Sequence, residues 1–172
     1  DEFPAPPWHQ IAACGLLLFR ETELRGSGPE AVAKRCYKVE RLGVLDPDEC
    51  KALQQFVKFV TEYKPTIVGW NTRGFDMPVI AARCLRHAVA FPYYYQSRDM
   101  RYRFTTDGHF DLADYLGDHG AARPAKLDGT AKLIGMPGKI DGCDGSKVAE
   151  MIADGRLDEV QAYVLSDVAQ PG

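Results

Sequence analysis

The sequence predicts an α/β fold, and three observations lead to this prediction. Residues 11–19 and 66–70 are nearly unbroken apolar runs of strand length. Residues 50–60 and 77–86 instead place apolar side chains at helical spacing. The resulting order is strand, strand, helix, strand, helix and then mostly helix, which is typical of an α/β arrangement. A chain of 172 residues has the usual size of one domain, so we expect a single domain over residues 1–172.

The first two strands are predicted from their apolar patterns. Residues 11–19 form an apolar run around Cys14 and Gly15, and we expect a buried strand there. Residues 21–34 mix charged side chains with glycine and proline, which predicts a loop between two strands. Residues 36–40 alternate apolar and polar side chains, as expected of a half-buried strand.

The first helix has a strong start signal. Asp46 is predicted to cap it, Pro47 suits the first helical position, and Glu49 completes a spacing similar to a capping box. The dipeptide Lys64-Pro65 is expected to end it. The apolar residues of its predicted buried face are Cys50, Leu53, Phe56, Val57 and Val60.

The rest of the chain contains one more aromatic segment and several short elements. Residues 91–104 are aromatic and basic. The other predicted elements are a buried strand at 66–70, a helix at 77–86, a short strand at 109–112, a helix at 127–134 stopped by Gly135, and helices at 146–153 and 157–169.

Composition excludes several classes of protein. The net charge of −3 argues against a non-specific DNA-coating protein. The five cysteines are scattered without a Cys-x-x-Cys pair, which is typical of reduced thiols inside a cell. No apolar run reaches the roughly 20 residues that a membrane-spanning helix needs. We therefore expect a cytoplasmic protein without a membrane partner.

Two segments carry candidate catalytic residues. Asp76 follows the strand at 66–70 and a polar turn with Asn71, and the ends of buried strands are where α/β proteins usually place their chemistry. Tyr163 and Asp167 are four positions apart, so they share one face of a helix. The alternatives are that Asp76 caps the next helix, that Tyr163 is a core aromatic residue, and that Asp167 is a solvated acid.

Several motifs occur together, in a fixed order along almost the entire chain. The motifs are Phe3-Pro4-x-Pro6-Pro7-x-His9-x-Ile11, Asn71-x-x-x-Phe75-Asp76, His109-Phe110-Asp111-Leu112, Leu127-Asp128, Leu133-Ile134-Gly135-Met136-Pro137-Gly138-Lys139, Asp141-Gly142 and Tyr163-x-x-x-Asp167. This set resembles the DEDD superfamily of 3′–5′ exonucleases, in the tyrosine-bearing form. The branch that it resembles most is the predicted exonuclease related to the proofreading domain of family B DNA polymerases.

The resemblance implies a fold, a reaction and a set of roles. The fold would be RNase H-like, a mixed sheet flanked by helices. The activity would be 3′–5′ hydrolysis at the end of a single-stranded nucleic acid, DNA rather than RNA, with two divalent cations, Mg²⁺ or Mn²⁺. Asp76 and Asp167 would be metal ligands, and Tyr163 would orient the attacking water. Asn71 and Phe75 would contact the terminal nucleotide.

The sequence departs from this family in one respect. A DEDD site has four carboxylates, and the first two come from an Asp-x-Glu on the first strand. Asp1 and Glu2 are adjacent, so their side chains would point to opposite faces of an extended chain. We therefore expect that this central strand lies upstream of residue 1. The alternative functions are a non-catalytic nucleic-acid-binding module on the same fold and a 3′–5′ exoribonuclease.

Other polar residues have two possible interpretations. The three arginines and the aromatic residues between 93 and 104 either bind a single strand or form a solvated loop. His9 and His109 are expected to be structural, and Asp111 and Asp128 to cap helices, with Asp111 the better outside candidate for the site. Lys139 lies in a glycine-rich loop that could touch a phosphate. We also predict that Asp76 and Asp167 face one cleft near the Tyr163 hydroxyl.

Overall fold

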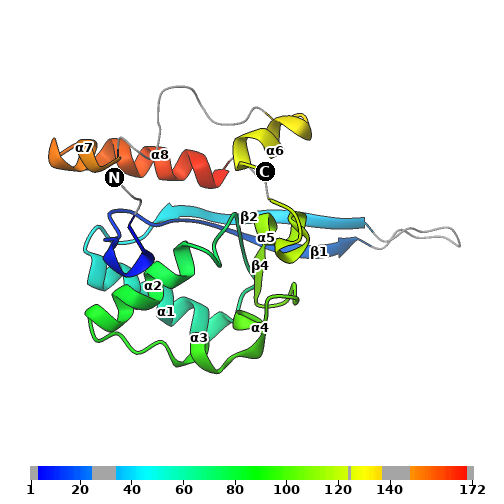
Figure 1. The fold of residues 1–172 in the computed structure, drawn as a ribbon, viewed down its shortest axis with the longest axis horizontal. Helices are drawn as coiled ribbons and strands as arrows, with labels where there is room; N and C mark the ends of the chain where they lie inside the picture. Colours follow the sequence, from blue (N-terminus) through cyan, green and yellow to red (C-terminus); the bar gives the residue numbers. More distant parts are fainter. Residues whose placement is uncertain (1–3, 25–33, 124, 137–147, 170–172) are drawn as a thin grey trace, which may run out of the picture. The chain divides into compact units, whose positions relative to one another are not determined.

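The computed structural model describes residues 4–24, 34–123, 125–136 and 148–169 (Figure 1). The chain divides into two compact units, and each combines segments that are distant in the sequence. The first unit is Asp1–Ala13 with Asp46–Ile140, and the second is Cys14–Leu45 with Asp141–Gly172. The two units are described separately below. The predicted motif residues at 137–142 lie outside the described residues.

Helix α1, Glu49–Tyr63, begins two residues later than predicted. Its N-cap is Asp48, whose carboxylate accepts the Lys51 N–H at 2.9 Å. The prediction that Asp46 is the cap is wrong, because Asp46 instead accepts the Asp48 N–H at 2.9 Å and forms the turn before the helix. The predicted end is confirmed, since Lys64 follows the helix in the left-handed region at φ 47°.

Glu49 does not complete a capping box. Its carboxylate accepts hydrogen bonds from Arg83 Nε at 2.7 Å, from the backbone N–H of Ile11 at 2.7 Å, and contacts His87 Nε2 at 2.7 Å. Burial alone would raise its pKa, but these hydrogen bonds and the charge of Arg83 lower the pKa of Glu49 to about 2. This buried ion pair joins the N-terminal segment, α1 and the C-terminal end of helix α2.

Helices α1 and α2, Asp76–Arg86, supply most of the apolar core of the first unit. The predicted buried face of α1 is confirmed for Leu53, Phe56, Val57 and Val60, while Cys50 is half-buried. Phe91 packs against α1, with its ring centroid 6.1 Å from that of Phe56. The buried residues that α2 adds are Met77, Val79, Ala81 and Cys84.

Two short strands lead to the candidate site. Strand β3, Ile67–Gly69, and strand β4, His109–Asp111, are parallel and paired from Ile67↔His109 to Gly69↔Asp111. The carboxyl ends of the two strands therefore lie side by side. The expectation of a buried strand at 66–70 is wrong in extent and burial, because Val68 is 42% exposed. Among the described residues, β3 pairs only with the three-residue strand β4, so its side chains are less covered by neighbouring residues.

The aromatic and basic segment at 91–104 contains two short helices. Helix α3, Pro92–Gln96, has proline at its start, and helix α4, Arg98–Arg101, is capped by Ser97. Helix α5, Leu112–Leu116, is capped by Asp111 as predicted. In helix α6, Leu127–Leu133, the N-cap is Lys126, so the prediction for Asp128 is wrong. Asp128 lies one position inside the first turn, where it pairs with Lys132 at 2.8 Å.

The second unit combines an antiparallel hairpin with the C-terminal helices (Figure 1). Strand β1, Gly15–Leu24, pairs with strand β2, Lys34–Val44, and the register shifts once, between Leu18 and Phe19. Strand β1 therefore starts later and ends later than the predicted strand at 11–19. It is also less buried than expected, since Phe19 is 43% exposed.

Helix α7, Val148–Ala153, is followed by helix α8, Leu157–Ala169, which packs on both strands of the hairpin. Gly15 lies directly against α8. A β-carbon there would lie 2.7 Å from Val164 Cγ1 and 3.1 Å from Val168 Cγ2, so α8 rests on a position that has no side chain. The predicted helix at 157–169 is confirmed in full.

The described strands thus form two small sheets, one antiparallel and one parallel, which are accompanied by helices in a mixed α/β arrangement. Within the described ranges, none of the helices is long and apolar enough to cross a membrane.

Candidate active site

The turn between β3 and α2 carries the first group of predicted site residues. Asn71 has φ 56°, and its carbonyl accepts the N–H groups of Gly74 at 3.1 Å and Phe75 at 3.0 Å. Asparagine tolerates this left-handed conformation better than most residues. The Asn71 side chain lies against Gly74, because a β-carbon at residue 74 would collide with Asn71 Oδ1. The absence of a side chain at Gly74 therefore leaves room for the Asn71 amide.

The carboxylate of Asp111 holds this turn on the end of β4. It accepts four backbone N–H groups, from Asn71 at 2.9 Å, Arg73 at 2.8 Å, Ala113 at 3.0 Å and Asp114 at 3.3 Å. The residue is only 4% exposed. A buried carboxylate is stable when N–H donors surround it in this way. Asp111 therefore has a structural role, in the turn and as the cap of α5.

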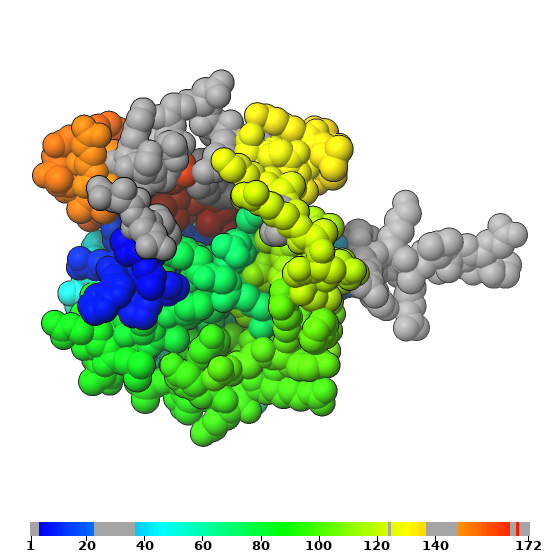
Figure 2. All heavy atoms as spheres, viewed as in Figure 1, coloured from blue at the N-terminus to red at the C-terminus, as the bar shows by residue number. Residues whose placement is uncertain are grey.

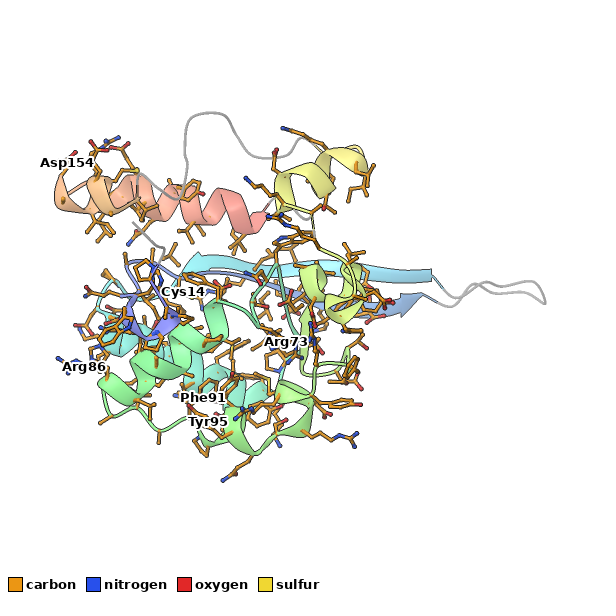
Figure 3. All side chains as sticks on the ribbon, viewed as in Figure 1. Cys14, Arg73, Arg86, Phe91, Tyr95 and Asp154 are labelled. Atoms are coloured by element: carbon orange, nitrogen blue, oxygen red, sulfur yellow. The ribbon has the colours of Figure 1, made fainter. Side chains whose placement is uncertain are left out.

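Arg73 and His109 fix the same turn from its other side. The Arg73 guanidinium, labelled in Figure 3, donates to the carbonyl oxygens of His109 at 2.6 Å, Met100 at 3.2 Å and Tyr102 at 3.3 Å. Thr72 Oγ1 lies 2.8 Å from His109 Nε2. Burial, and then the charge of Arg73, lower the pKa of His109 to about 4, so its imidazole is neutral near pH 7. The prediction that His109 is structural is confirmed.

Three of the predicted site residues line one pocket of about 430 Å³. They are Asn71, Phe75 and Asp76. The opposite wall comes from the N-terminal segment, which lies against α2 (Figure 2). The other residues that line the pocket are Pro4, Pro6, Trp70 and Gly74.

His9 holds this wall of the pocket in place. Its Nε2 lies 2.8 Å from the Pro4 carbonyl oxygen, and its ring meets the edge of Phe75 with centroids 4.9 Å apart. The structural role predicted for His9 is confirmed. The proline-rich segment, which is in part a 3-10 turn at Pro6–Trp8, is therefore tied to the same site as the turn at Asn71.

Asp76 is the first residue of α2, and Phe75 occupies the N-cap position. The alternative that Asp76 caps this helix is therefore wrong. The residue is exposed at the pocket wall, yet the protein around its carboxyl group limits hydration. This desolvation raises the pKa of Asp76, and the negative charge of Asp111 acts in the same direction. A cation beside Asp76 would relieve both effects.

A second pocket, of about 510 Å³, shares Asn71 and Gly74 with the first one. Its polar lining includes Arg73, Arg101 and Arg103, and Tyr94 adds an aromatic surface. Arg103 forms a bidentate pair with Asp114, with Nη2 2.5 Å from Oδ1 and Nε 3.0 Å from Oδ2. The two pockets therefore meet at the turn that Asp111 holds.

Tyr163 and Asp167 lie in the second unit, on α8. Tyr163 is half-buried, and the four-residue separation places both positions on one face of the helix. The side chain of Asp167 lies outside what the structure describes. Among the described side chains, no group of three or more His, Cys, Asp or Glu residues is arranged to hold a metal ion. The prediction of one cleft for Asp76, Asp167 and Tyr163 stays a prediction.

Reasoning from the sequence missed how this site is supported. Asp111 was considered for the site because it ends a strand, and that signal located the right residue but not its four N–H partners. Arg73 and Trp70 were not singled out. Trp70 directly precedes Asn71, and Arg73 lies inside the Asn71-x-x-x-Phe75-Asp76 motif, so their position at a suspected site was the available signal.

Comparison with known proteins identifies the family. Residues 2–171 match the family described as a predicted 3′–5′ exonuclease related to the exonuclease domain of PolB. No curated protein and no solved structure matches the chain. The matched span includes both units and every residue of the candidate site. The chain therefore belongs to the family of predicted 3′–5′ exonucleases related to the exonuclease domain of PolB.

Proposed function

We propose that this protein is a metal-dependent 3′–5′ exonuclease that removes nucleotides from the end of a single-stranded nucleic acid, DNA in preference to RNA. The observation that carries the proposal is the first pocket, in which Asp76 lies beside Asn71 and Phe75. Family membership supports the reaction class. We also propose one exonuclease domain with an RNase H-like fold, since a mixed sheet contains both the antiparallel and the parallel kinds of pairing found here.

The first pocket suits the 3′-terminal nucleotide. Its volume of about 430 Å³ lies in the ordinary range for small-ligand sites. Trp70 and Phe75 offer aromatic faces on which a base can stack, and Pro4 and Pro6 extend the apolar wall. The Asn71 amide, exposed at the pocket, can donate to and accept from polar atoms of the sugar or base.

Asp76 suits a ligand for a hard divalent cation. Mg²⁺ and Mn²⁺ prefer carboxylate oxygens, and Asp76 presents a carboxylate at the pocket wall. Its raised pKa reflects incomplete solvation and the charge of Asp111, and a bound cation would stabilise the ionised form. We propose that Asp167 supplies a second carboxylate to the same pair of cations.

The chemistry follows from these roles. When bound, the two cations supply a metal-activated hydroxide and stabilise the leaving 3′ oxygen. Asn71 and Phe75 hold the terminal nucleotide so that its phosphodiester lies near Asp76. The Tyr163 hydroxyl, four residues before Asp167, orients the attacking water. The products would be nucleoside 5′-monophosphates.

The test is hydrolysis of a 5′-labelled single-stranded oligonucleotide by the full-length natural protein. We expect stepwise shortening from the 3′ end with Mg²⁺ or Mn²⁺ and none with EDTA. Asp76→Asn, which keeps the shape of the side chain, should reduce the rate at least 100-fold. Asp107→Asn is the matched control, because it removes an exposed carboxylate outside the first pocket and should leave the rate unchanged.

Two outcomes would favour the other functions. If the full-length protein binds the oligonucleotide but shortens it with neither Mg²⁺ nor Mn²⁺, a nucleic-acid-binding module is the better description. If a matched RNA is shortened faster than DNA, the protein is an exoribonuclease. An unchanged rate in Asp76→Asn would contradict the assignment of the site.

A further inference from the structure

We propose that the surface around α3 and α4 binds the nucleotides that precede the 3′ end of the strand, by stacking and by phosphate contacts. We call it the aromatic–arginine surface, and it consists of Tyr94, Tyr95, Arg98, Arg101 and Tyr102. This inference rests on the proposed function for the identity of its ligand, but its test measures binding without hydrolysis.

The side chains of this surface are ordered by contacts with one another. The Arg98 guanidinium carbon lies 4.8 Å from the centroid of the Tyr102 ring. The Arg101 guanidinium carbon lies 5.5 Å and 5.6 Å from the ring centroids of Tyr94 and Tyr95. Such cation–π contacts hold planar groups in place while their remaining N–H donors stay available for phosphate oxygens.

The rings remain accessible even though they are ordered. Tyr95 is 49% exposed and Tyr102 is 43% exposed, and both arginines are exposed. Tyr95 is labelled in Figure 3, next to the buried Phe91, which anchors α3 in the core. Exposed aromatic rings on an anchored helix are the kind of platform on which unpaired bases stack.

The aromatic row continues beyond Tyr102. The Phe104 ring lies 5.6 Å from the Tyr102 ring and 4.7 Å from the His119 ring, and Phe104 is 61% exposed. The row therefore runs along several neighbouring positions and fits an extended ligand better than a single small molecule.

The charges also favour a phosphate backbone. In the second pocket, Asp114 is neutralised by Arg103, and Asp111 is surrounded by its N–H donors. In the part of the chain that the structure describes, neither Arg98 nor Arg101 forms an ion pair with a carboxylate. The cationic charge of these two residues is therefore available to a ligand.

Asp99, between these arginines on α4, does not cancel this charge by direct pairing. It packs against the backbone at Gly108, where a β-carbon would lie 2.9 Å from Asp99 Cβ. Arg98 and Arg101 are three positions apart and so share one face of α4, while Asp99 is turned away from Arg98 by about 100° of helix rotation.

The two pockets give the path of the strand. Asn71 and Gly74 line both of them, and Arg101 and Tyr94 line the second. A strand with its 3′ nucleotide beside Asp76 and Phe75 can therefore cross this turn and continue over Arg101. Stacking and phosphate contacts do not read base identity, so the surface should accept any sequence.

The experiment measures fluorescence anisotropy of a labelled twelve-residue oligothymidylate in EDTA, with a two-residue oligothymidylate as the short probe. Tyr102→Leu and Arg101→Ala should each weaken binding of the long probe at least fivefold and leave the short probe unchanged. Arg101→Ala should also lower the salt dependence of binding by about 0.7 in log–log slope, the value for one phosphate contact to a single strand.

The controls remove the same side chains elsewhere in the first unit. Tyr63→Leu removes a tyrosine that is 64% exposed on α1, and Arg86→Ala removes an exposed arginine at the end of α2 (Figure 3). Both should bind the long probe as the wild type does. Arg101→Lys keeps the charge but loses the planar group, so it should recover the salt dependence without recovering full affinity.

The inference is overturned if the wild type does not bind the long probe, or if Tyr102→Leu and Arg101→Ala bind it within twofold of the wild type. These results are separable from those of the nuclease test. Weakened binding in these variants without any hydrolysis by the wild type would support the surface and contradict the nuclease. Hydrolysis that depends on Asp76, with unchanged binding in both variants, would support the nuclease and contradict the surface.

Discussion

The carboxylate of Asp111 accepts the backbone N–H of Arg73 at 2.8 Å, across 38 positions of sequence. The guanidinium of Arg73 in turn donates to the carbonyl oxygen of His109, two residues before Asp111, at 2.6 Å. These reciprocal bonds attach the turn that carries Asn71 and Phe75 to the end of β4. The geometry of the candidate site therefore depends on residues other than the three predicted to line it, Asn71, Phe75 and Asp76.

Asp111→Asn should destabilise the protein by about 1–3 kcal/mol, because the new amide group places a donor against one of the backbone N–H groups that the carboxylate accepted. Urea unfolding followed by circular dichroism measures this loss. Asp107→Asn, at an exposed position, should stay within about 0.5 kcal/mol of the wild type. Equal stability of the two variants would show that Asp111 does not hold the turn.

Gly74→Ala should displace the Asn71 side chain, since the new methyl group would collide with Asn71 Oδ1. We expect a cost of about 1 kcal/mol in unfolding free energy and weaker binding of the 3′-terminal nucleotide. Gly129→Ala is the control, because a β-carbon at this helical position meets nothing within 4 Å. It should raise stability by about 0.4–1 kcal/mol by restricting the unfolded chain. Binding of the two-residue oligothymidylate distinguishes the variants, and unaltered binding in Gly74→Ala would argue against a role for Asn71.

Acid should weaken the protein through Glu49, whose pKa is lowered to about 2. The folded state binds the proton less readily than the unfolded state, so this stabilisation is complete above about pH 4.5 and is lost as the pH falls toward 2. The full effect is at most about 3 kcal/mol. Glu49→Gln should lower stability at pH 7 and remove this acid dependence, as measured by urea unfolding at several pH values. Glu62→Gln, exposed on the same helix, should change neither property, and a wild-type acid response in Glu49→Gln would contradict the assignment.

His109 should cause a second loss of stability on acidification, which begins at a higher pH than the loss through Glu49. Its pKa falls from 6.5 to about 4 on burial, so protonation favours the unfolded chain as the pH drops below about 6.5. Between pH 7 and pH 5 the wild type should lose about 2 kcal/mol from this group. His109→Gln, which keeps a polar group near Thr72, should lack this loss in urea unfolding experiments. If both proteins lose the same stability over this range, another group is responsible.

The elements that could be predicted from the sequence are those with strong local signals. Helix α8 was predicted at its observed bounds, and the buried face of α1 followed from the spacing of Leu53, Phe56 and Val60. The position of β4 was predicted from the segment His109-Phe110-Asp111-Leu112, in which Asp111 ends the strand and caps the next helix. In each case the local pattern and the tertiary contacts agree.

The errors arose where tertiary contacts compete with local patterns. At the start of α1, Glu49 is required by Arg83 and Ile11, and the cap moves from Asp46 to Asp48. The strand expected at 11–19 begins only at Gly15, because that is where pairing with β2 begins. Apolar composition alone does not specify where a strand finds its partner.

Of the candidate site, the sequence located Asn71, Phe75 and Asp76, which share one pocket. It did not predict that the proline-rich segment would form the facing wall. That contact depends on His9, which bonds to Pro4 within the same segment and packs on Phe75, a residue far away in the sequence.

The contact of Gly15 with Val164 makes a prediction about how the sequence can change over evolutionary time. Helix α8 packs against a position without a side chain, so the side chains at positions 15 and 164 must together fit one limited space. A methyl group gained at position 15 should be accompanied by a methyl group lost at position 164. Among natural relatives, we therefore expect these two positions to vary together, with alanine at position 15 matched by a residue smaller than valine at position 164.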